Sequence, residues 1–169
     1  MPSTPTRWRS CPRTTGSPTR ASWATTWESY LSGTPEWETL LSIDALNETE
    51  DANWAWKGAT CLSPAYERCL VRLSRGGADA VEIREFDLTT KSFIEDGFFL
   101  PEAKGGATWM SEDEVLVSTD VGEGSMTDSG YPRVVKRWQR GTPLAEATTV
   151  FEGETSDVGA WAGSFRRGE

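Results

Sequence analysis

Runs in which apolar and polar residues alternate are the clearest pattern in the chain, and several of them lie between residues 54 and 99. Cys69 to Leu73 carries C-L-V-R-L and ends at a pair of glycines, and Ala80 to Phe86 carries A-V-E-I-R-E-F and ends at D-L-T-T-K. The run from Ser92 to Phe99 is short and aromatic. Alternation that stops at Gly, Asp or Thr is typical of antiparallel hairpins. The pattern predicts one four-stranded antiparallel sheet, which is too small to be stable without neighbours.

The strand predicted at Ala80 to Phe86 carries apolar and charged residues on both of its faces. Side chains alternate between the two faces of a strand. One face holds Ala80, Glu82, Arg84 and Phe86, and the other holds Val81, Ile83 and Glu85. We therefore expect this strand to be partly covered on both sides.

A second set of strand-like runs follows between residues 107 and 152. Its members are Ala107 to Met110, Val115 to Thr119, Arg133 to Gln139 and Ala147 to Glu152. The two sets are offset by about fifty residues, which is typical of four-stranded propeller blades, although hairpins of an antiparallel sandwich would give the same runs. The fold class we predict is all-β, with about two four-stranded antiparallel blades of an incomplete propeller: blade one at about 54–99 and blade two at about 107–152.

The segments before the first blade differ sharply in composition. Residues 1–26 contain arginine, proline, serine and threonine but no acidic residue, and the acidic residues begin at Glu28. We expect 1–26 to be a disordered or non-native basic leader, with an organellar transit peptide or a wrongly translated start as alternatives. The next residues, from Trp27, predict a strand end and a turn, then a strand at Glu36 to Ile43 and a short helical turn at Asp44 to Glu50.

Charge and cysteine content limit the partners and the compartment. The formal net charge is -9 and the isoelectric point is about 4.6, which argues against nucleic acid and anionic membranes as partners. No apolar run has the length of a membrane span. The three cysteines, Cys11, Cys61 and Cys69, match no zinc spacing, so we expect free thiols in a reducing compartment and a cytoplasmic location.

The sequence contains no histidine, which excludes a Ser-His-Asp or Cys-His catalytic unit within it. We therefore assign no catalytic, cofactor-binding or metal-binding residue and expect no cofactor. The most site-like segment is the loop Asp120 to Gly130, whose carboxylates lack the spacing of a calcium loop, and we interpret it as a connection between strands. Its carboxylate residues are Asp120, Glu123 and Asp128.

Other conspicuous residues have structural explanations. Four tryptophans at corresponding places in the two sets of strands are expected to fill the space between blades rather than to form a ligand platform. Two charged groups and the tripeptide Arg75-Gly76-Gly77 are interpreted as turns, and the charged ones as solvated. The tryptophans are Trp54, Trp56, Trp109 and Trp138, and the charged groups are Glu112-Asp113-Glu114 and Arg166-Arg167.

Long collinear segments between about Trp27 and Ala160 resemble the amino-terminal propeller of bacterial prolyl oligopeptidase-family serine peptidases. The likeness is carried by Ser29-Tyr30, Pro35 to Leu46, Asn53 to Ala59, Arg68 to Val71, Leu73 to Ala80, Arg84 to Asp87 and Thr127 to Arg133.

This resemblance implies the first blades of a seven-bladed propeller. In that family the propeller covers an α/β-hydrolase domain, admits short peptides, and leaves cleavage after proline to a Ser-Asp-His triad in the hydrolase domain. No triad residue can be assigned to a position of this sequence, because the resemblance covers no hydrolase domain. We expect a propeller fragment, inactive alone, with residues 161–169 as a truncated tail. The alternative is a non-catalytic β-sheet interaction module. The isolated chain is expected to self-associate through blade edges, whereas a monomer with a sharp cooperative melt would favour the module over the fragment.

Overall fold

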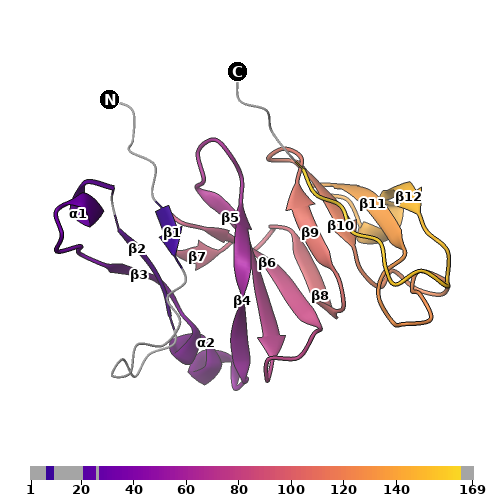
Figure 1. Ribbon diagram of the computed structural model, residues 1–169, viewed down its shortest axis with the longest axis horizontal. Helices are drawn as coiled ribbons and strands as arrows, with labels where there is room; N and C mark the ends of the chain where they lie inside the picture. Colours follow the sequence, from indigo (N-terminus) through magenta and orange to yellow (C-terminus); the bar gives the residue numbers. More distant parts are fainter. Residues whose placement is uncertain (1–6, 10–20, 26, 165–169) are drawn as a thin grey trace.

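The computed structural model describes residues 7–9, 21–25 and 27–164 of the chain. Three antiparallel sheets follow one another along the sequence and lie next to each other across the molecule, with the amino-terminal sheet at one end (Figure 1). No helix in these ranges is long and apolar enough to cross a membrane.

The first sheet has the order β1-β2-β3 and is formed by β1 (Arg7–Arg9), β2 (Ala21–Thr25) and β3 (Glu38–Ser42). The disorder expected for 1–26 is therefore wrong for two segments, because β2 pairs with β1 on one side and with β3 on the other. The remaining residues of that predicted leader lie outside the described ranges.

Between β2 and β3 the chain forms a short helix, α1 (Trp27–Leu31), so the strand end predicted there is also wrong. Backbone Ser32 N–H donates to the carbonyls of Glu28 and Ser29, which closes the last turn of this helix. Local helical hydrogen bonds thus override the strand end that the break at Gly33-Thr34-Pro35 suggested.

The second helix, α2 (Ile43–Glu50), agrees with the predicted helical turn after the strand. Ser42 caps it, because the Ser42 side chain accepts a hydrogen bond from the backbone N–H of Ala45. Asp51 ends it in the left-handed conformation with φ of 48°. Ile43, the first residue of the helix, is buried against blade one.

Blade one contains β4 (Trp54–Cys61), β5 (Arg68–Arg75), β6 (Val81–Asp87), β7 (Ser92–Phe93) and β8 (Phe99–Ala103). The strands β4 to β7 are neighbours in sequence order, and β8 also pairs with β6. The predicted antiparallel sheet is confirmed, and β8 adds a fifth strand to the four that were predicted. The aromatic run at its end is divided into β7 and β8, with a turn at Gly97 between them.

Blade two contains β9 (Gly106–Trp109), β10 (Glu114–Ser118), β11 (Val134–Gln139) and β12 (Thr148–Glu152), with a 3-10 helix η1 (Leu144–Glu146) before its last strand. Its strands are paired antiparallel in sequence order. This is the second four-stranded sheet that the pattern predicted. All five residues of β12, its outermost strand, are exposed.

Two apolar clusters cover the opposite faces of blade one, as the mixed pattern of β6 predicted. The cluster toward α2 contains Ile43, Trp54, Val71, Leu73 and Phe86. The cluster shared with blade two contains Leu70, Val81, Ile83, Phe98, Leu100, Trp109, Val115, Val117, Trp138 and Ala147.

The tryptophans divide between these clusters. Trp109 and Trp138 lie between the two blades, as predicted, whereas Trp54 and Trp56 pack on the opposite face of blade one, toward α2.

The expectation of free thiols is wrong for two of the cysteines, because Cys61 and Cys69 form a disulfide. Register explains the pairing: Cys61 ends β4 and lies directly opposite Cys69 on β5. An odd number of cysteines hid this pair from sequence reasoning, since the partners become neighbours only once the hairpin is in register. Cys11 lies outside the described ranges.

Candidate functional site at the junction of the blades

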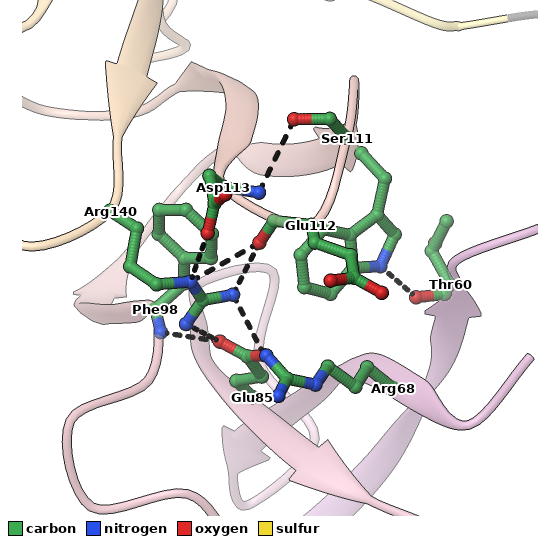
Figure 2. Close-up of polar contacts among 9 residues, drawn as sticks. Thr60, Arg68, Glu85, Phe98, Ser111, Glu112, Asp113 and Arg140 are labelled. Carbon is green, nitrogen blue, oxygen red and sulfur yellow. Dashed lines mark hydrogen bonds and ion pairs between the residues drawn. The ribbon is translucent and has the colours of Figure 1, made fainter.

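A fully buried carboxylate, that of Glu85, lies where blade one meets blade two (Figure 2). Its Oε2 accepts hydrogen bonds from the backbone N–H of Phe98 at 2.9 Å and from Arg140 Nη1 at 2.8 Å. Its Oε1 accepts a hydrogen bond from Arg140 Nη2 at 3.0 Å and pairs with Arg68 Nη1 at 3.5 Å. A buried charge is tolerated only when it is paired and hydrogen-bonded in this way.

Arg140, directly after β11, is the residue of blade two that contacts Glu85. The guanidinium Nη2 donates to the carbonyl of Glu112 at 2.5 Å, and Nε pairs with Asp113 at 3.3 Å. Its backbone N–H donates to the Asp113 carbonyl at 2.8 Å. Burial lowers the pKa of the Arg140 guanidinium, but the hydrogen bonds and charge of Glu85 outweigh it and leave the pKa above its ordinary value. The Arg140 guanidinium therefore stays protonated at neutral pH.

Aromatic rings pack around this ion pair. The Arg140 guanidinium lies 4.5 Å from the centre of the Phe98 ring, which meets Trp138 and Trp109 edge-to-face at 5.1 and 5.7 Å. Trp109 Nε1 donates to the carbonyl of Thr60 at 2.8 Å, which connects β9 to the end of β4. The junction thus combines apolar burial, a cation over a ring, and polar groups that all have partners.

Gly97 has no side chain, and Glu85 occupies the space in which a side chain at position 97 would lie. A Cβ at position 97 would lie 2.8 Å from Glu85 Cβ and 3.0 Å from Glu85 Oε2. The turn between β7 and β8 therefore needs glycine because of close packing, not because of its backbone conformation.

A second polar cluster lies on the opposite face of blade one, between β6 and α2. Arg84 Nη1 and Nη2 donate to the two carboxylate oxygens of Glu50 at 2.5 and 2.9 Å, and Arg84 Nε pairs with Glu82. The hydrogen bond from Arg84 lowers the pKa of Glu50, against the opposing effect of burial. Trp54 Nε1 also donates to Glu50, at 2.8 Å. This cluster fixes α2 on the sheet.

The comparisons with known proteins agree with this architecture. The model of the family described as prolyl oligopeptidase, N-terminal beta-propeller domain, matches residues 12–165. The chain belongs to this family. The match begins at residue 12, whereas the segments that resemble the family in the sequence begin at about Trp27. The likeness therefore extends further toward the amino terminus.

Relatives of this prolyl oligopeptidase-family chain are much longer than it is. An uncharacterised peptidase of Sinorhizobium fredii is 44% identical over 142 residues, which are 84% of this chain and 20% of the relative. An uncharacterised peptidase of Rickettsia prowazekii is 28% identical over 133 residues, 74% of this chain and 18% of the relative. The chain spans about a fifth of the length of the curated relatives it matches.

Among solved structures, a post-proline cleaving enzyme from Rickettsia typhi is similar with a TM-score of 0.74 and 28% identity, over 80% of this chain and 21% of that one. Oligopeptidase B from Leishmania major, at 12% identity and a TM-score of 0.58, covers 82% of this chain and 18% of its own length, and supports the fold alone.

In this family member, the loop Asp120 to Gly130 is held by hydrogen bonds within it and to the segment after β12. Asp120 Oδ1 accepts hydrogen bonds from the backbone N–H of Gly122 at 2.9 Å and from Ser125 Oγ at 3.2 Å. Ser129 Oγ donates to the Val158 carbonyl at 2.7 Å. Within the part of the chain that the structure describes, no three His, Cys, Asp or Glu side chains gather in a way that could hold a metal ion. The geometry agrees with an inter-strand connection.

The two turns predicted at Arg75-Gly76-Gly77 and Glu112-Asp113-Glu114 differ in what they contribute to the structure. Gly76 and Gly77 adopt positive φ angles of 61° and 85°, as a turn requires. The acidic turn before β10 is more than a solvated turn, because Glu112 and Asp113 both hold Arg140. Sequence reasoning missed Glu85 and Arg140 as partners, and only the unusual acidic residue on an apolar face of β6 signalled the site. Arg166 and Arg167 lie outside the described ranges.

A polar cavity of about 300 Å³ in blade two is lined by residues of β10, β11, η1 and β12. Its charged lining residues are Glu114, Arg137 and Glu146. Glu114 and Arg137 pair with each other at 2.7 Å, so neither side chain of this pair is free to act as an acid or a base.

We expect Glu85→Ala to lower the free energy of unfolding by roughly 3–5 kcal/mol, because it leaves the Arg140 guanidinium without its buried partner. The matched control is Glu114→Ala, which removes the more exposed pair with Arg137 and should cost no more than about 1 kcal/mol. Urea titration at low protein concentration measures both. Equal losses for the two variants would contradict a special role for the buried carboxylate.

Proposed function

We propose that this chain supplies the first two blades of the propeller of a prolyl oligopeptidase-like serine endopeptidase. In the complete protein, the propeller would cover an α/β-hydrolase domain and limit access to short peptides, which that domain would cleave after proline. The proposal rests on the family match over residues 12–165. The similar Rickettsia typhi structure is that of a post-proline cleaving enzyme, which supports the choice of substrate class.

Within this proposal the chain itself is non-catalytic. The Ser-Asp-His mechanism needs an imidazole to accept and return the serine proton, and the sequence has none. What the two blades contribute is a rigid wall: they share one apolar cluster and a buried ion pair. We propose a cytoplasmic location for the complete protein.

The purified chain should not hydrolyse a chromogenic prolyl peptide, because no group in it can act as the histidine of the triad. Release of the chromophore is followed spectrophotometrically, with the post-proline cleaving enzyme of Rickettsia typhi as positive control. Serine-hydrolase activity that copurifies with the chain in constant stoichiometry would contradict the proposal.

We also propose that the isolated chain self-associates through the edge of blade two. β12 is an outermost strand with all five residues exposed, including Val150 at 51% and Phe151 at 57%. An edge strand with apolar side chains and unpaired backbone groups is a template for pairing with another chain.

Phe151→Lys should shift the chain toward the monomer in sedimentation velocity, because a charged side chain on the edge opposes pairing. Leu31→Lys is the control: Leu31 is 65% exposed but lies on α1, away from that edge, and the substitution should leave the distribution unchanged. A wild-type chain that is monomeric and melts in one sharp transition would contradict self-association.

That same outcome would favour the second candidate function, a self-standing interaction module. The fully exposed β12 is the observation in its favour, since such a strand can accept an extended partner peptide by strand addition.

A further inference from the structure

The Cys61–Cys69 disulfide lies next to two residues of blade one that take part in the junction with blade two. Cys61 is the last residue of β4, Cys69 is the second residue of β5, and the two are directly paired across the hairpin. Cys69 is fully buried, whereas Cys61 is partly exposed. The sulfurs therefore join the two strands at the end nearest the junction residues.

Each half of the disulfide is next to a residue that reaches the junction. Thr60 precedes Cys61, and its carbonyl accepts the hydrogen bond from Trp109 Nε1 of blade two at 2.8 Å. Arg68 precedes Cys69, and its guanidinium pairs with the buried carboxylate of Glu85 at 3.5 Å. Figure 2 shows Thr60 and Arg68 converging on the junction from these two strands.

Besides the disulfide, backbone hydrogen bonds hold this end of the hairpin, among them one from Leu88 N–H to the Glu67 carbonyl at 2.8 Å. The loop 62–67 is closed by the hydrogen bonds Leu62 N–H to Arg68 carbonyl at 2.9 Å and Tyr66 N–H to Leu62 carbonyl at 2.8 Å. Hydrogen bonds at a strand end fray readily, and the covalent bond restricts that fraying.

We propose that the Cys61–Cys69 disulfide is a redox switch that sets how firmly blade one holds blade two. In the oxidised form, the Thr60 carbonyl and the Arg68 guanidinium are fixed in the positions that the junction requires. Reduction frees the two strand ends and weakens both contacts, while the cores of the two blades remain formed. The switch concerns contacts within this chain and goes beyond the proposed peptidase function.

The reductant is a dithiol. Its first thiolate attacks the partly exposed sulfur of Cys61, so that a mixed disulfide forms there and Cys69 leaves as a thiolate, which takes a proton. The second thiol of the reductant, as its thiolate, then attacks the mixed disulfide and releases Cys61 as a thiolate, which takes a proton. Two electrons pass to the protein, and the reductant becomes a cyclic disulfide.

The indole protons of Trp109 and Trp138 distinguish a change at the junction from a change within blade two. Trp109 Nε1 donates across the junction to Thr60, whereas Trp138 Nε1 donates within blade two, to the Thr142 carbonyl at 2.7 Å. Hydrogen exchange of both indoles is followed by NMR in a ¹⁵N-labelled Cys11→Ser chain, before and after treatment with dithiothreitol. Mass spectrometry checks that reduction adds two hydrogens.

We expect reduction to accelerate exchange of the Trp109 indole proton by about tenfold and to change that of Trp138 by less than about twofold. A Cys61→Ser, Cys69→Ser chain should show the fast Trp109 exchange with or without dithiothreitol. Unchanged Trp109 exchange after reduction, equal acceleration of both indoles, an oxidised chain without protection at Trp109, or a purified chain without the disulfide would each overturn the proposal. None of these outcomes depends on peptidase activity.

Discussion

A carboxylate that is removed from water must be surrounded by cations and N–H donors, and Glu85 imposes this requirement on both blades. Its donors come from the turn before β8, from β5, and from the residue after β11. Only one placement of blade two brings Arg140 to Glu85 and also brings the Trp109 indole to the Thr60 carbonyl. The apolar cluster supplies most of the favourable burial, and the ion pair selects the arrangement in which that burial occurs.

Blade one is the middle layer of the molecule because β6 is covered on both faces. Neighbouring residues Arg84 and Glu85 point to opposite sides, and each ends in a network of charges: Arg84 holds α2 through Glu50, and Glu85 holds blade two through Arg140. A single strand, β6, thus connects the position of α2 with that of blade two. For a propeller wall in a prolyl oligopeptidase-family protein, such rigidity lets neighbouring blades keep a fixed geometry.

Period-two alternation and turn residues were enough to predict the antiparallel sheets of both blades, because those signals are local. Contacts that depend on how the strands align with one another could not be predicted from the sequence. Cys61 and Cys69 become partners only when β4 and β5 align, and Arg140 meets Glu85 across 55 residues of sequence. The helix α1 was mistaken for a strand end because its five residues are too few to show a helical period, and the break at Gly33-Thr34-Pro35 fits the end of either element. The sequence shows an acidic residue, Glu85, on an apolar face of β6, but it does not show that Arg140 is its partner.

If Glu85 and Arg140 couple the two blades into one unit, a double-mutant cycle measures that coupling. Glu85→Gln, Arg140→Met and the double variant are compared with the parent chain by urea unfolding at low protein concentration. A coupling free energy of about 2–3 kcal/mol is the predicted result, because each single variant leaves a buried polar group without its partner. A coupling below about 0.5 kcal/mol, as found for independent sites, would contradict the account.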